Sequence, residues 1–408
     1  GLGKSYASLV AILRSPQLQS DLGAIEWNQL RQEPTVRRQP LIDADVGQLR
    51  EHIETAPYCR GPNGQRLQFS QEECWRALIQ VATEHNYHPV AEYLASLVWD
   101  GTERICHVAE DVLGIEPTGL TQAILRRWFI SAVARPLRAG CKVDTVLILQ
   151  GDQGAKKSSF FEVLAGRDWF SDSAIDLAKN DAPMVMRRVW ILEWAELESM
   201  QRARDANAVK QFITSRVDIY RPPYGRAVID VPRTCVIVGT TNDKEILADP
   251  TGNRRYWILE DCDRVDLSKL AAWRDQLWAE AVVLYRTPEP WHLTEAEDRE
   301  LGIVQERFEK IDAWESKVIP WLANPRGFLD GTWQAMPVTT ANVLEYAVGK
   351  QPGQWSPRDA SRVATLLRGF GWEQERRRGA GRVRVWKPRP DPTGTTSVPL
   401  TLKLNGDT

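Results

Sequence analysis

The residues best suited to chemistry lie in a glycine-rich turn after an apolar run over residues 145–149. The run ends at Gly151, and Lys157 and Ser158 follow at the start of a helical pattern. Glycines let backbone N–H groups approach a phosphate, while a helix amino terminus and a lysine supply positive charge and a serine hydroxyl holds magnesium. Strand, glycine loop, Lys-Ser and helix is the order of a phosphate-binding P-loop. We therefore predict that this turn binds ATP and Mg²⁺.

One position departs from the strict P-loop pattern, because Lys156 stands where that pattern has its second glycine. A strand-to-helix turn with incidental lysines is therefore the alternative for this stretch taken alone. Within the P-loop interpretation, Lys157 would be the phosphate-binding cation and Ser158 a magnesium ligand. The residues expected to contact the nucleotide are Gly151, Gln153, Gly154, Ala155, Lys156, Lys157, Ser158 and Ser159.

Polar residues also follow two apolar runs downstream of the turn. Glu193 closes the run Val-Trp-Ile-Leu-Glu, and Glu196 lies three residues further on. We predict that Glu193 orients magnesium or polarises the attacking water, with Glu196 as a second candidate. Asn242 follows the apolar strand predicted over residues 234–239, where its amide would sense the γ-phosphate and position water. The alternative for Glu193 is a chance occurrence, because an apolar run followed by glutamate is common. The alternative for Asn242 is a structural asparagine in a turn.

Arg254 and Arg255 lie on a glycine turn. Two interpretations are open for this pair. The arginines would make a salt bridge at a helix end, or they would reach a neighbouring subunit's nucleotide site as arginine fingers.

Two basic regions indicate contacts with DNA. Alternating runs around a Pro-Gly turn predict a β-hairpin over residues 217–231, whose tip contains Arg221, Tyr224, Gly225 and Arg226. Arginines can contact the phosphates of single-stranded DNA while an aromatic ring stacks on a base. The alternative is a solvated hairpin with an exposed tyrosine.

The second basic region lies in the last part of the chain. Helices predicted over 312–322, 339–349 and 356–369, followed by a hairpin over 372–386, give the order of a winged helix. The hairpin is rich in arginine, and the residues expected to contact DNA phosphates are Arg376, Arg377, Arg378 and Arg382. A winged helix that binds a protein partner is the alternative.

The composition is that of an ordinary soluble protein with two or three domains, since 43% of the 408 residues are hydrophobic and 26% are charged. The net charge of -2 argues against a uniformly basic nucleic-acid binder. Scattered cysteines and histidines argue against a zinc site, and we find no apolar run long enough for a membrane span. Most of the 17 tryptophans fit apolar patterns and are expected in the core. We expect a cytoplasmic protein. Because the sequence begins with glycine, we also expect it to be part of a longer chain.

These patterns predict an α/β protein with a P-loop core. The expected division is a helical amino-terminal domain over residues 1–125, a P-loop ATPase domain over 126–310, a winged-helix domain over 311–390 and a flexible tail over 391–408.

The motifs occur together in an order that resembles the virulence-associated E family of phages, prophages and pathogenicity islands. The stretches that carry the resemblance are residues 151–158, 193–197, 218–226, 238–242 and 249–255. That family is similar to superfamily 3 helicases, which are ring-forming AAA+ ATPases. The resemblance implies a Walker A motif at Lys157 and Ser158 and a Walker B motif at Glu193 with Glu196. It further implies sensor 1 at Asn242, an arginine finger at Arg254 or Arg255, and a hairpin that grips DNA in a ring channel.

The function implied is an ATP-dependent DNA helicase or translocase for replication of a phage or mobile genetic element. It would act as a homo-hexamer in a bacterial host, with DNA as its partner. A primase is a further expected partner, because that family often carries a primase domain upstream. Two alternatives stay open. One is an origin-binding replication initiator that uses ATP for assembly without unwinding, and the other is a P-loop phosphotransferase acting on a small molecule.

Overall fold

The computed structural model describes residues 4–57, 59–61, 63–173, 182–194, 206–221, 228–243, 246–247, 253–308, 312–329, 331–376 and 384–389. The chain forms two compact units, Gly1–Glu309 and Lys310–Thr408. No helix in the described ranges combines the length and apolar character that a bilayer span requires.

The first part of the larger unit has a hydrophobic core of its own, built by residues between Leu9 and Ala82. Its helices are α1 (Tyr6–Arg14), α2 (Pro16–Leu22), α3 (Asp43–Thr55) and α4 (Gln71–Ala82). A sheet of order β3-β2-β1-β4 accompanies them, with strands β1 (Ile25–Asn28), β2 (Glu33–Val36), β3 (Gln39–Pro40) and β4 (Asn86–Tyr87).

The domain predicted over residues 1–125 as mainly helical thus also contains a four-stranded sheet. Strands of two to four residues are too short to show a period in the sequence. The predicted boundary at residue 125 also falls inside α6 (Gly119–Leu137), which packs with later elements. The same later core includes residues of α5 (Pro89–Ser96), η1 (Ile105–His107) and η2 (Ala109–Leu113).

A parallel five-stranded sheet forms the centre of the larger unit, in the order β11-β5-β10-β7-β6. Its strands are β5 (Val146–Gln150), β6 (Phe170–Ser171), β7 (Ile191–Trp194), β10 (Val236–Thr241) and β11 (Tyr256–Leu259). Because successive side chains in a strand point to opposite faces, burial on both faces gives the continuous apolar runs seen in the sequence. Parallel strands also place all of their carboxyl ends at one edge.

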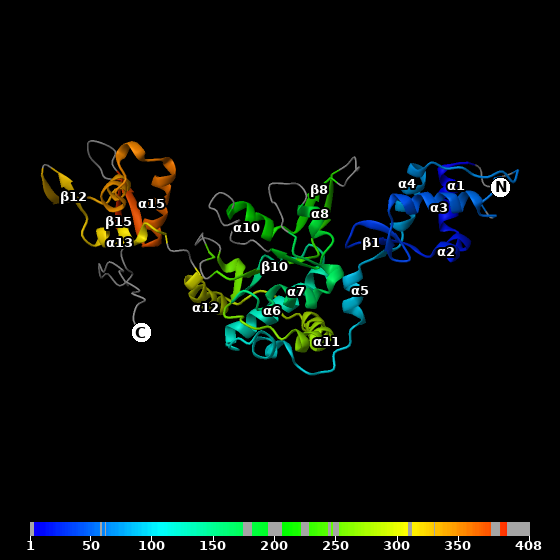
Figure 1. Ribbon diagram of the computed structural model, residues 1–408, viewed down its shortest axis with the longest axis horizontal. Helices are drawn as coiled ribbons and strands as arrows, with labels where there is room; N and C mark the ends of the chain where they lie inside the picture. The colour runs from blue at the N-terminus through cyan, green and yellow to red at the C-terminus, as the bar shows by residue number, and fades with distance from the viewer. Residues whose placement is uncertain are drawn as a thin grey trace. The chain divides into compact units, whose positions relative to one another are not determined.

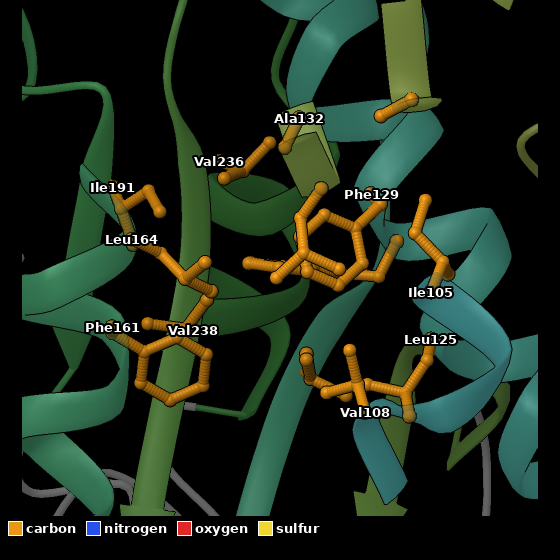
Figure 2. Close-up of a cluster of buried hydrophobic side chains, with 14 of the residues drawn as sticks. Ile105, Val108, Leu125, Phe129, Ala132, Phe161, Leu164, Ile191, Val236 and Val238 are labelled. Atoms are coloured by element: carbon orange, nitrogen blue, oxygen red, sulfur yellow. The ribbon is translucent and has the colours of Figure 1, made fainter. Parts of the chain in front are cut away.

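Helices cover both faces of this sheet (Figure 1). On one face, α6, α7 (Lys157–Ala165) and α11 (Leu267–Arg286) pack against Leu147 and Leu149 of β5. Figure 2 shows Phe129 of α6 and Phe161 of α7 in this layer with Val236 and Val238 of β10. On the other face, α8 (Ala182–Met186) and α10 (Ala206–Thr214) pack against Val146 and Ile148 of β5.

The helices of this unit begin where the sequence supplies capping side chains. Thr118 accepts a hydrogen bond from Thr121 N at the start of α6, and Asp266 accepts from Ser268 N and Lys269 N at the start of α11. A capping box starts α12 (Glu295–Gln305). The remaining elements are η3 (Arg167–Trp169), β8 (Val217–Tyr220), β9 (Ile229–Pro232), η4 (Asn253–Arg255) and η5 (Glu306–Phe308).

The smaller unit contains the helices and the hairpin that the sequence predicts, in the predicted order. They are α13 (Glu315–Ala323), α14 (Thr340–Asn342) continued by η6 (Val343–Val348), α15 (Pro357–Gly369) and the pair β14 (Trp372–Arg376) and β15 (Arg384–Pro388). A short turn, η7 (Pro352–Gln354), precedes α15. An additional hairpin, β12 (Arg326–Leu329) with β13 (Thr332–Ala335), was not predicted.

Candidate functional site

The glycine-rich turn predicted to bind phosphate connects β5 to α7 at the carboxyl edge of the sheet. Its first residue must be glycine, since a Cβ atom on Gly151 would lie 2.4 Å from the backbone oxygen of Cys262. The segment after β11 holds the turn in place. Cys262 N donates to Gln150 O (2.8 Å) and Val265 N donates to Ala155 O (3.2 Å).

Lys156 adopts the backbone conformation that glycine would provide at this position. Its φ of 65° and ψ of 31° lie in the left-handed region, which costs an ordinary residue about 1–2 kcal/mol. The Lys156 side chain is exposed to solvent. In the described chain no side chain caps the first turn of α7, and such a helix terminus favours an anion.

Lys157 is buried at the centre of the turn, and its ammonium group is fully hydrogen-bonded. Nζ donates to Gly151 O (2.7 Å), to Asp152 O (2.7 Å) and to Oδ1 of Asn242 (2.9 Å). Burial lowers the pKa of Lys157 from its ordinary value. The two carbonyl partners belong to the turn itself. A phosphate entering the turn would therefore offer the ammonium group a charged acceptor in place of neutral ones.

Glu193 of β7 lies beside Ser158 of α7, although β10 separates β7 from β5, the strand that precedes α7. It is only 1% exposed, and its Oε1 accepts from Ser158 Oγ (2.8 Å) and Thr240 Oγ1 (2.5 Å). Its Oε2 is buried and has no hydrogen-bond partner within the described residues. Burial raises the pKa of Glu193, against the effect of the two hydroxyl donors.

The oxygen atoms of Ser158 and Glu193 suit magnesium. Mg²⁺ prefers oxygen ligands and usually binds proteins through one or two carboxylates plus substrate phosphates. An acceptor oxygen that is buried without a donor is rare in proteins and calls for a partner. The predicted metal ligands therefore fit Mg²⁺ by their chemistry and position.

Asn242 and Thr240 come from the end of β10, between β5 and β7. Thr241 pairs with Gln150, which places Asn242 beside the start of the turn. Sequence reasoning proposed Asn242 but missed Thr240. The two-residue periodicity of a strand could have identified Thr240, because it precedes Asn242 by two residues and therefore points to the same face of the sheet.

Arg254 and Arg255 lie away from this cluster, at the opposite edge of the sheet. They precede β11, whose Tyr256 pairs with Val146 at the amino end of β5, whereas the turn follows the carboxyl end of β5. The five residues of β5 span about 16 Å, which is well beyond an arginine side chain. Neither arginine can therefore reach the turn of its own subunit.

The two arginines instead border a cavity of about 390 Å³. Arg254 is exposed, and the cavity is lined by Lys142, Val143, Asp144, Thr145, Arg254, Arg255, Trp257, Trp291, His292, Leu293 and Asp298. Buried Gln305 of α12 fixes the arginine turn, because its Nε2 donates to the backbone oxygens of Asn253 (2.6 Å) and Tyr256 (2.7 Å).

The predicted channel hairpin has the expected antiparallel stem, in which Val217 pairs with Pro232 and Tyr220 with Ile229. Arg221, at the end of β8, is exposed. The hairpin residues Tyr224, Gly225 and Arg226 lie outside the described residues, as do Glu196, Arg377, Arg378 and Arg382. Arg376 is the last residue of β14.

A buried ion pair that the sequence did not reveal anchors this stem. Arg233, 3% exposed, donates through Nη2 to Oδ1 of Asp218 on β8 (2.5 Å) and through Nη1 to Phe212 O (2.6 Å). β10 begins three residues after Arg233. The stem is thus joined by a short segment to β10, which Asn242 directly follows.

The comparisons with known proteins agree with this architecture. The family model of the virulence-associated protein E-like domain matches residues 94–310, just over half of the chain. An apo structure of the C-terminal region of NrS-1 (A form) is 11% identical, covers 93% of this chain and 99% of that chain, and superposes with a TM-score of 0.51, a likeness of fold. Another apo structure of that region is 12% identical with coverages of 94% and 99% and a TM-score of 0.47. A search of the curated proteins finds no match.

Proposed function

Since the chain belongs to the virulence-associated protein E-like family, we propose that it is an ATP-dependent DNA helicase or translocase for replication of a phage or mobile genetic element. The observation that carries this proposal is one cluster of side chains at the carboxyl edge of the parallel sheet. Lys157 contacts Asn242 there, and Ser158 and Thr240 both donate to buried Glu193.

Each group of the cluster has a task in phosphoryl transfer. The turn over residues 151–159 would bind the triphosphate through backbone N–H groups and Lys157. Ser158 and Glu193 would hold Mg²⁺, which neutralises phosphate charge when bound. Glu193 would also accept a proton from the attacking water, for which a carboxylate of raised pKa is suited. Asn242 would position the γ-phosphate, and Glu196 remains a second candidate for the water.

The position of the arginines supports action as a ring. Since Arg254 and Arg255 cannot serve their own turn, a neighbouring subunit would use them, as arginine fingers supplied in trans do. A homo-hexamer would complete one nucleotide site at each interface. Arg221, Tyr224, Gly225 and Arg226 would grip single-stranded DNA in the channel, and the winged helix over residues 311–390 would contact duplex DNA through Arg376, Arg377, Arg378 and Arg382. The site of action would be the cytoplasm of a bacterial host, and a primase would be a further partner.

The test compares ATP hydrolysis and strand displacement in two lysine variants. Lys157→Ala should abolish both activities, because it removes the buried cation. Lys317→Ala is the matched control and should keep both, because that side chain is exposed in α13, outside the proposed nucleotide site. Hydrolysis without strand displacement would favour the origin-binding initiator. Monomeric behaviour with hydrolysis indifferent to DNA would favour a small-molecule phosphotransferase, and near wild-type turnover by Lys157→Ala would reject the site.

A further inference from the structure

The hairpin β12–β13 exposes two aromatic rings to solvent. Phe328 is 54% exposed and Trp333 is 61% exposed. The two residues pair directly across the hairpin, and their ring centroids lie 5.7 Å apart at an interplanar angle of 66°. By contrast, Trp128, Trp190 and Trp278 are among the most deeply buried side chains of the larger unit. Trp333 therefore departs from the core role expected of the tryptophans, and such exposure indicates a binding role.

The hairpin is attached firmly to its own unit through its other face. A Cβ atom on Gly327 would lie 2.9 Å from the ring of Tyr346, so the backbone packs tightly there. Trp321 Nε1 donates to Arg326 O (2.8 Å) and Met336 N donates to Pro325 O (2.9 Å). Because side chains alternate along a strand, Phe328 points away from the face that Gly327 presents. The rings thus project from a fixed platform.

Positive charge accompanies the rings. Arg326 is exposed and lies two residues before Phe328, so it shares the face of the ring. Residues 310–390 contain 14 lysines and arginines against seven aspartates and glutamates, although the whole chain has a net charge of -2. A stable protein interface has a broad apolar core. Here Arg326 and its cross-strand partner Ala335 lie beside the two rings on the same face of the hairpin, which suits an anionic ligand with flat apolar groups better.

We propose that hairpin β12–β13 binds single-stranded DNA, with Phe328 and Trp333 stacking on unpaired bases and Arg326 contacting a phosphate. Aromatic platforms beside basic residues are the general means of binding single strands without reading their sequence. The inference rests on the proposed function for the identity of its ligand. It adds a single-strand contact to the unit for which the sequence predicts only a contact with duplex DNA.

Fluorescence anisotropy of a labelled oligothymidine, measured on the full chain without nucleotide, tests the proposal. Changing Phe328→Ala and Trp333→Ala together should weaken binding between about five-fold and 150-fold for each base that loses its stacking partner. Trp333→Phe keeps an aromatic face and should bind nearly as the unchanged chain does. Ile303→Ala is the matched control, since Ile303 is 63% exposed in α12 and should leave affinity unchanged. Ultraviolet cross-linking to an iodouracil oligonucleotide should label the peptide that contains Trp333.

Unchanged DNA affinity in the double variant would overturn the proposal. Unchanged affinity together with a smaller assembled mass would assign the hairpin to a contact between subunits. The measurement needs no hydrolysis, so its failure leaves the Lys157 test of the proposed function standing. Conversely, binding of oligothymidine through these rings by a chain that hydrolyses no ATP would support the inference and reject the proposed helicase function.

Discussion

The proposal that neighbouring subunits share a nucleotide site leads to a mixing experiment. Lys157→Ala removes the cation of the turn, and Arg254→Ala removes a group that lies about 16 Å away across β5, at the other edge of the sheet. If the arginine acts only on a neighbour, each variant damages a different half of every interface. Neither homogeneous assembly contains an intact site, but a mixed assembly does.

The expected recovery follows from counting interfaces. An intact site needs the turn of an Arg254→Ala subunit and the arginine of a Lys157→Ala neighbour. In an equal random mixture these two conditions are each met about half of the time, so about one interface in four is complete. An arginine finger raises the turnover number by about 10³–10⁵-fold. Each variant on its own should therefore hydrolyse almost no ATP. The mixture should therefore regain about one quarter of the unmodified activity per interface.

The assay is steady-state ATP hydrolysis after the two variants are mixed under conditions that allow subunit exchange, checked by native mass measurement. The matched control mixes Lys157→Ala with Glu193→Gln. Both changes lie in the same half of the site, because Ser158 and Glu193 of one chain are hydrogen-bonded to each other. This mixture should therefore regain no ATP hydrolysis. Exchanged assemblies that recover nothing with Arg254→Ala, and nothing with Arg255→Ala in its place, would refute the shared site.

Three further predictions concern the turn and its carboxylate. Burial raises the pKa of Glu193 above its ordinary 4.5, so its neutral form favours folding and its charged form, at higher pH, opposes folding. Glu193→Gln should therefore raise Tm at neutral pH and lower turnover at least 100-fold; a Tm gain that persists unchanged below pH 4.5 would contradict this. Lys156→Gly should remove strain of about 1–2 kcal/mol at an entropic cost of about 0.4–1 kcal/mol, which raises Tm by up to about 3 °C; a fall in Tm would show that Lys156 is unstrained. Gly151→Ala should cost about 1–3 kcal/mol and abolish hydrolysis, since its Cβ would meet the backbone of Cys262; normal melting and turnover would contradict the close contact.

The sequence predicted those elements whose signals are local. The strands β5, β7 and β10 are buried on both faces, so each is a continuous apolar run. Ser356 and Pro357 predicted the start of α15, where the structure has a capping box. The hairpin β12–β13 was missed because its strands are largely exposed and only four residues long, which is too short for a period to stand out in the sequence.

The contacts that complete the candidate site depend on strand order, which no local pattern contains. Glu193 reaches Ser158 because β10 lies between β7 and β5 and contributes Thr240 and Asn242. The residue types could be predicted from the sequence, but the position of β10 between β7 and β5 could not. The separation of Arg254 from the turn likewise became evident only from the register of β11 on β5.

Strand β10 connects the hairpin stem to the cluster of Lys157, Ser158, Glu193, Thr240 and Asn242. Its start follows Arg233, which is tied to Asp218 of the stem, and its end supplies Thr240 and Asn242 to Glu193 and Lys157. A six-residue strand held between two neighbours in a packed sheet moves as a unit rather than bending. A change in the partners of Lys157 when phosphate enters or leaves would therefore be transmitted along β10 to Arg233. In this arrangement Asn242, which accepts from Lys157, directly follows the strand that begins three residues after Arg233.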